Sequence, residues 1–87
     1  MSSGRALTLQ RTIVTPTERG RFLERARHLR EHYATHHCRY WVFEETELPG
    51  AFIEFTESTD AAALSAALAG APDAVVDPAR IYQEVAL

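Results

Sequence analysis

The sequence contains no lysine and no asparagine, and Cys38 is its single cysteine. Without lysine the chain has no side-chain amine for a Schiff base, and without asparagine it lacks any chemistry that needs that carboxamide. One cysteine excludes an internal disulfide and is typical of a reducing compartment. All nine basic residues are arginine, which we attribute to a GC-rich genome. The composition therefore excludes lysine-based covalent catalysis and a disulfide-stabilised fold.

Long apolar runs are also absent, since none approaches the roughly 20 residues that a membrane span needs. The first residues are polar and do not resemble a signal peptide, so we expect a cytoplasmic protein without membrane contacts. The 87 residues predict one domain over 1–87, with a disordered tail at 1–6. A chain of this size buries only about 60 to 65% of its unfolded surface, so a partner surface would add to its thin core.

The first half of the chain predicts a strand followed by a long helix. Apolar and polar residues alternate over 7–14, as in a strand with one buried face. The run Thr15-Pro16-Thr17-Glu18 has the pattern of a capping box with proline at the first helical position, and predicts a helix over 16–36. The apolar stripe of this helix consists of Phe22, Ala26, Leu29 and Tyr33.

The second half predicts a hairpin, a short helix and a last strand. The expected elements are a strand at 39–44, a strand at 51–56, a helix at 60–69 and a strand at 80–87. The turn chemistry of Leu48-Pro49-Gly50 joins the first two of these strands. Ser58, Thr59 or Asp60 caps the start of the short helix, and Gly70 ends it. A loop that contains Asp73 and Asp77-Pro78 leads to the last strand.

This order predicts an α+β, ferredoxin-like βαββαβ fold, with a four-stranded antiparallel sheet and both helices on one face. The second strand is apolar on both sides, because Trp41 and Phe43 alternate with Tyr40 and Val42. Two helices cover only one face of a sheet. A second subunit is the simplest cover for the other face, so we expect a homodimer.

The hairpin Tyr40-Trp41-Val42-Phe43 and 48–55, with the element order, resembles the dimeric α+β barrel superfamily, which includes the antibiotic-biosynthesis monooxygenase-like domains. The resemblance implies a sheet-to-sheet homodimer that holds a small organic ligand between sheet and helices. Some members of that superfamily are cofactor-free oxygenases, isomerases or haem-degrading enzymes. The resemblance therefore also implies such an activity as one expectation for this chain. This chain differs from the catalytic members because it has no asparagine and no histidine in 61–69.

Charged and aromatic residues on the predicted strands and helix form the candidate site. The ligand-binding candidates are Arg11, Tyr33, Trp41, Glu54 and Tyr82. A guanidinium binds a ligand carboxylate, a carboxylate serves acid–base chemistry, and aromatic rings form the walls. The alternative is that the mid-strand charges Arg11, Glu54 and Glu84 form salt bridges between strands or between subunits.

A row of histidines and a set of arginines have simpler explanations than a metal site or nucleic-acid binding. His28, His32 and His36 lie at intervals of four, as metal ligands on a helix can, but no third ligand from another element is evident. We interpret the row as a solvated helix face and expect no metal and no cofactor. The helix arginines alternate with glutamates, and the isoelectric point of about 5.7 opposes phosphate binding, so we expect no nucleic-acid partner.

The sequence assigns no catalytic residue, so whether the protein is an enzyme stays open. It predicts a homodimeric domain that binds a small aromatic or apolar acid between sheet and helices. The alternative is a cofactor-independent monooxygenase or isomerase of the antibiotic-biosynthesis monooxygenase-like type.

Overall fold

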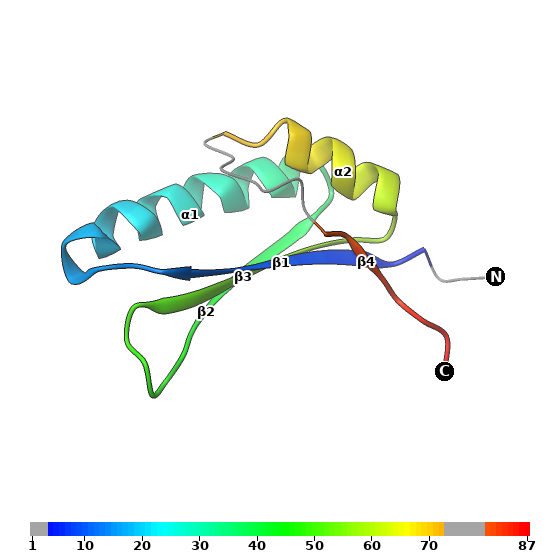
Figure 1. Cartoon of the computed structure of the whole chain (residues 1–87). Helices are drawn as coiled ribbons and strands as arrows, with labels where there is room; N and C mark the ends of the chain where they lie inside the picture. The colour runs from blue at the N-terminus through cyan, green and yellow to red at the C-terminus, as the bar shows by residue number, and fades with distance from the viewer. Residues whose placement is uncertain (1–3, 73–79) are drawn as a thin grey trace.

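The computed structural model describes residues 4–72 and 80–87, and the loop predicted around Asp73 and Asp77 lies outside them. The elements in chain order are β1 (Ala6–Ile13), a 3-10 turn (Pro16–Glu18), α1 (Arg19–Thr35), β2 (Arg39–Glu44), β3 (Ala51–Ser58), α2 (Ala61–Ala69) and β4 (Tyr82–Gln83). The sheet has the antiparallel order β2-β3-β1-β4, and both helices lie on one face of it (Figure 1). The predicted α+β, ferredoxin-like arrangement is confirmed.

The ordered chain begins earlier than the expected tail at 1–6 allows. Ala6 is the first residue of β1 and is 2% exposed, and it pairs with Ser58 in the β1–β3 ladder. Arg5 donates from Nε to the Glu57 carboxylate at 2.6 Å. These contacts fix the start of β1, so the tail can include only residues before this point.

The predicted capping box at the start of α1 does not form. Thr15 makes no side-chain cap, and its hydroxyl lies 3.2 Å from the Thr17 hydroxyl. A 3-10 turn opens the helix instead, because proline at Pro16 sets a helical φ without needing its own donor. The α-helix proper begins at Arg19, three residues after the predicted start.

Arg19 ties the start of α1 to the β2–β3 hairpin. Its guanidinium donates to both Glu44 oxygens, at 2.6 and 2.9 Å. The Gly50 amide donates to the same carboxylate at 2.9 Å. Gly50 has a φ of +93°, and a Cβ there would lie 2.5 Å from the Val14 carbonyl oxygen, so the turn requires glycine.

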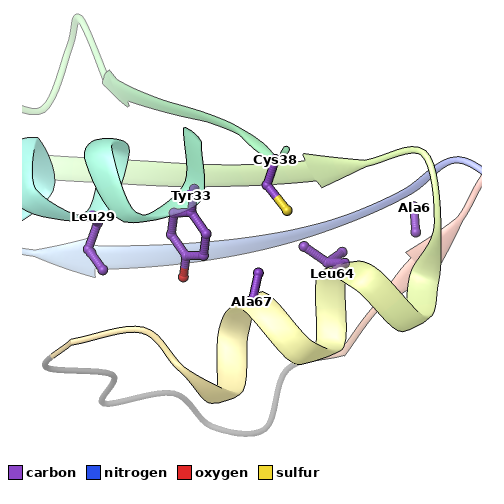
Figure 2. Packing of buried hydrophobic residues seen from close by; sticks show 6 residues of the cluster. All are labelled: Ala6, Leu29, Tyr33, Cys38, Leu64 and Ala67. Carbon is purple, nitrogen blue, oxygen red and sulfur yellow. The ribbon is translucent and has the colours of Figure 1, made fainter. Parts of the chain in front are cut away.

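The main core lies between the two helices and the sheet. Figure 2 shows its buried members, which are Ala6, Leu29, Tyr33, Cys38, Leu64 and Ala67. A second cluster under the first half of α1 contains stacked Phe22 and Phe52, whose ring centroids are 4.5 Å apart. The apolar stripe predicted for α1 is the side that these clusters bury.

Asp60 caps α2. Its carboxylate accepts from the Ala62 amide at 2.7 Å and from the Ala63 amide at 3.4 Å, which satisfies two of the unpaired amides of the first turn. Of the three predicted capping residues, Asp60 is the one that caps the helix, and its backbone is extended. The helix ends at Gly70, as predicted.

The last strand is much shorter than the predicted 80–87. Only Tyr82 and Gln83 pair with β1, and the Glu84 amide makes one further bond to the Arg5 carbonyl at 2.8 Å. The described residues place no strand beside 85–87. Among the described residues, no strand pairs with the outer edge of β1 beyond Leu7.

Candidate functional site

A groove of about 830 Å³ runs between α1 and the outer edge of β1. Its apolar lining includes Leu9, Ile13, Val14, Phe22, Leu29 and Leu68. The short β4 leaves this edge of β1 open, and the long α1 extends above it (Figure 1). The groove therefore follows from the difference in length between a helix of 17 residues and a strand of two.

A buried carboxylate lies on the floor of the groove. Glu54 is 7% exposed and projects from β3 toward the helices, in register with Val42 and Gln10. The Tyr40 hydroxyl donates to Glu54 Oε1 at 2.5 Å, and Arg25 Nη2 lies 3.4 Å from both carboxylate oxygens. A buried charge is tolerated when it is paired and hydrogen-bonded, and these two donors meet that need.

Two tyrosines beside Glu54 are held in their neutral form. Burial, followed by the hydrogen bond to Glu54 and its negative charge, raises the pKa of Tyr40 far above the ordinary value. Burial also raises the pKa of Tyr33, and the Glu54 charge adds to this effect while a hydrogen bond with Thr56 opposes it. Their ring centroids are 5.4 Å apart. Both hydroxyls therefore remain hydrogen-bond donors at neutral pH.

The mouth of the groove carries more positive than negative charge. Arg21 and Arg80 are exposed and line it, together with Glu18. Within residues 4–72 and 80–87, neither arginine forms an ion pair. Arg25 is the inner cation of the groove, and it is committed to Glu54. The rim therefore has two guanidinium groups with their donors available.

The structure places three of the five predicted site residues in the groove and two on the opposite face of the sheet. Tyr33, Glu54 and Tyr82 line the groove. Arg11 and Trp41 lie on the opposite face of the sheet, because they pair with Ile53 and Phe55, which alternate with Glu54 along β3. The sheet therefore separates the predicted guanidinium and indole from the predicted carboxylate.

The alternative prediction was that the mid-strand charges form salt bridges between strands or between subunits. Each of them does have an ion-pair partner, but that partner lies outside the strands, in the turn after β2, in α1 or before β1. Arg11 lies 3.5 Å from Glu45, Glu54 lies 3.4 Å from Arg25, and Glu84 lies 3.6 Å from Arg5. All three pairs are within one chain. In the case of Glu54, a salt bridge and a place in the groove coexist.

Sequence reasoning missed four groove residues on which the site depends, which are Arg21, Arg25, Tyr40 and Arg80. The helix arginines were interpreted together as a solvated face. The position of Arg25, three residues after Phe22, places it at the border of the apolar stripe and was the available signal. The turn at Gly50 sets the β2–β3 register, so counting from it would have placed Tyr40 on the same face as Glu54.

The face of the sheet away from the helices exposes large apolar side chains. Its members include Leu9 (44% exposed), Ile13 (61%), Trp41 (39%) and Phe43 (55%). We call this surface the open face. Two of the charges on it are paired within the chain, Arg11 with Glu45 and Glu57 with Arg5. Arg39 shares the face of Trp41 and Phe43 and has no ion pair among the described residues. Arg11 lies between Leu9 and Ile13 along β1, so the apolar side chains surround one ion-paired guanidinium.

The histidine row has a structural role in part. His32 Nε2 lies 2.9 Å from the Ala67 carbonyl oxygen and links α1 to the last turn of α2. His36 Nδ1 lies 3.0 Å from the His32 carbonyl oxygen, and His28 is exposed. In the described part of the chain, no three His, Cys, Asp or Glu side chains are grouped to hold a metal ion.

Comparisons with known proteins support the fold. No protein-family model matches the chain, and no curated protein does. Among solved structures, the chain is similar to a conserved protein from Methanosarcina mazei Go1, with a TM-score of 0.76, 18% sequence identity and 95% of each chain covered. At this identity the likeness shows the fold alone. The chain is therefore defined as an α+β domain of ferredoxin-like arrangement with a helix–strand groove.

None of its described helices has the length and apolar character that crossing a membrane requires.

Proposed function

We propose that the protein is a homodimeric domain whose groove binds a small acid with an aromatic or apolar body. The observation that carries this proposal is the groove itself, which combines apolar walls, the buried Glu54 and, at its mouth, two arginines without an ion pair among the described residues. Its volume of about 830 Å³ falls in the range of roughly 300 to 1,000 Å³ that is usual for small-molecule sites.

The charges at the mouth indicate an acid. Arg21 and Arg80 present guanidinium donors whose planar fork matches a carboxylate, and no described side chain neutralises them. Arg11, which the sequence favoured for this contact, lies on the other face and pairs with Glu45. The apolar body of the ligand would lie along Phe22 and Leu29.

The open face supports the homodimer. Its large side chains are 39 to 61% exposed in the single chain, although a contiguous apolar surface of this kind is usually covered by a partner. A second copy is the occupant that fits, because the same apolar patch on both copies forms a self-complementary interface under twofold symmetry. The ion-pair partners of Arg11 and Glu57 within the chain limit the charge that such an interface would leave unpaired.

The acid-binding proposal can be tested by calorimetric titration with phenylacetate and with its neutral analogue phenylacetamide. We expect the acid to bind more tightly, and the double variant Arg21→Ala/Arg80→Ala to bind it about tenfold more weakly, because charge-assisted hydrogen bonds are lost. Arg27→Ala is the matched control, since this exposed arginine of α1 lies outside the groove.

Equal affinity for acid and amide would contradict the proposal, as would a loss in Arg27→Ala equal to that in the double variant. Conversion of a bound acid to a product would favour the enzymatic alternative, a cofactor-independent monooxygenase or isomerase.

A further inference from the structure

We infer that the ligand carries a neutral hydroxyl group in addition to its acid, and that this hydroxyl donates a hydrogen bond to Glu54 Oε2 on the groove floor. The inference rests on the proposed function and narrows the ligand class to hydroxyl-bearing aryl acids. The acid lies at the mouth, near Arg21 and Arg80, and the hydroxyl points inward.

The Glu54 carboxylate has hydrogen-bond acceptor sites that its described neighbours do not fill. An ionised carboxylate accepts at about four lone-pair sites. Oε1 accepts from Tyr40 at 2.5 Å and from Arg25 at 3.4 Å, whereas within residues 4–72 and 80–87 Oε2 accepts from Arg25 alone, again at 3.4 Å. That distance is long for a charge-assisted bond, which is usually about 2.7 to 2.9 Å. Oε2 therefore lacks a close donor.

The neighbouring side chains do not supply this donor. Tyr40 is committed to Oε1, and among the described residues no hydrogen bond joins Tyr33 to Glu54. Glu54 is 7% exposed, so bulk water reaches it little, yet it lines the groove. A buried carboxylate with an open acceptor facing a cavity favours a ligand that brings a donor.

The charges around Glu54 decide which donor fits. A ligand ammonium would meet the Arg25 guanidinium, which lies 3.4 Å from the same carboxylate. A second carboxylate would meet the negative charge of Glu54 itself. A neutral hydroxyl avoids both repulsions and makes a short O–H···O⁻ bond, which is among the stronger hydrogen bonds in proteins.

The test compares three ligands of similar shape by calorimetry: 4-hydroxyphenylacetate, 3-hydroxyphenylacetate and 4-methoxyphenylacetate, each against phenylacetate. The methoxy compound keeps the oxygen but cannot donate. We expect at least one hydroxy acid to bind roughly ten- to hundredfold more tightly than phenylacetate, as a hydrogen bond to a charged group allows. The methoxy compound should show no such gain.

The variant Glu54→Gln keeps the shape of the side chain and removes its charge. Within this variant, the advantage of the hydroxy acid over phenylacetate should fall to about threefold or less, because a neutral acceptor makes a weaker bond. Glu47→Gln, in the exposed turn between β2 and β3, is the matched control and should leave all affinities unchanged. Circular dichroism checks that each variant folds.

The outcomes separate the two proposals. If phenylacetate and the hydroxy acids bind equally, or if the methoxy compound matches the hydroxy acids, the inference is overturned and the acid-binding function stands. If no aryl acid binds, the proposed function fails and the inference fails with it. The ligand comparison decides the question even if Glu54→Gln does not fold.

Discussion

On one side of β3, Glu54 is 7% exposed and lies under α1 with Tyr40 and Arg25 as partners. On the other side of the same strand, Phe55 meets Phe43 edge to face, at 5.8 Å between ring centroids, on a surface without a cover in the single chain. The helix-covered face buries polar groups and satisfies them. The open face exposes large apolar side chains. The comparison teaches that one face satisfies its polar groups within the chain while the other leaves apolar surface uncovered, and we propose that the first encloses a ligand and the second meets a copy.

The largest expected effect concerns the core of the helix-covered face. Leu64→Ala should lower the free energy of unfolding by about 2 to 5 kcal/mol, because Leu64 is 0% exposed and the vacated volume cannot refill. Urea denaturation followed by circular dichroism measures this loss. It should be the same at low and high protein concentration.

Phe43→Ala is the matched truncation on the open face. The loss in free energy of unfolding that Phe43→Ala causes should grow with protein concentration, because we expect Phe43 to stabilise the protein through association. A concentration-independent loss as large as that of Leu64→Ala would contradict the distinction between the two faces.

The second prediction breaks the open face directly. Phe43→Glu should weaken self-association roughly a hundredfold or more, because a charge would be buried in an apolar interface without a partner. Sedimentation velocity over a range of concentrations measures the change. Leu48→Glu is the control, since Leu48 is 44% exposed but lies in the turn after β2. Equal dissociation of both variants, or a monomeric wild type, would refute the homodimer.

Much of the fold was predictable from local pattern. Alternation predicted β1 and β2 to within one residue, and the stripe of Phe22, Ala26, Leu29 and Tyr33 predicted the buried side of α1. The element order then predicted the sheet and the side shared by the helices. These features depend on periodicity and short-range chemistry, which a sequence displays directly.

The candidate site was harder to predict because it depends on register and on strand length. Arg11 and Glu54 look equivalent along their strands, yet one points to the open face and the other to the groove. The pattern could not tell which face meets the helices, since both faces of β2 are apolar. The short β4 was missed because its length depends on which of its residues pair with β1, and the composition of residues 80–87 does not display that pairing.

The smallest expected effect is a dependence of the free energy of unfolding on pH, which arises from Glu44 at the end of β2. The Arg19 hydrogen bond, with the Gly50 amide, lowers the pKa of Glu44 from its ordinary value of 4.5 to about 2. A folded-state pKa below the unfolded value stabilises the fold fully above pH 4.5, and this contribution is lost as the pH falls toward 2. We therefore expect the stability advantage of the wild type over Glu44→Gln to be constant above about pH 5 and to shrink below it.

Urea denaturation at pH 7, 4 and 2.5 checks this dependence. Arg19→Gln should flatten most of it, because the guanidinium is the main cause of the lowered pKa. A difference between wild type and Glu44→Gln that does not change with pH would contradict the assignment.

The single tryptophan of the chain, Trp41, is 39% exposed and belongs to the open face, whereas Tyr33 and Tyr40 belong to the groove. The open face is thus labelled by the one indole of the chain. Indole emission should therefore report the proposed pairing of two copies, without a dye and without altering a residue.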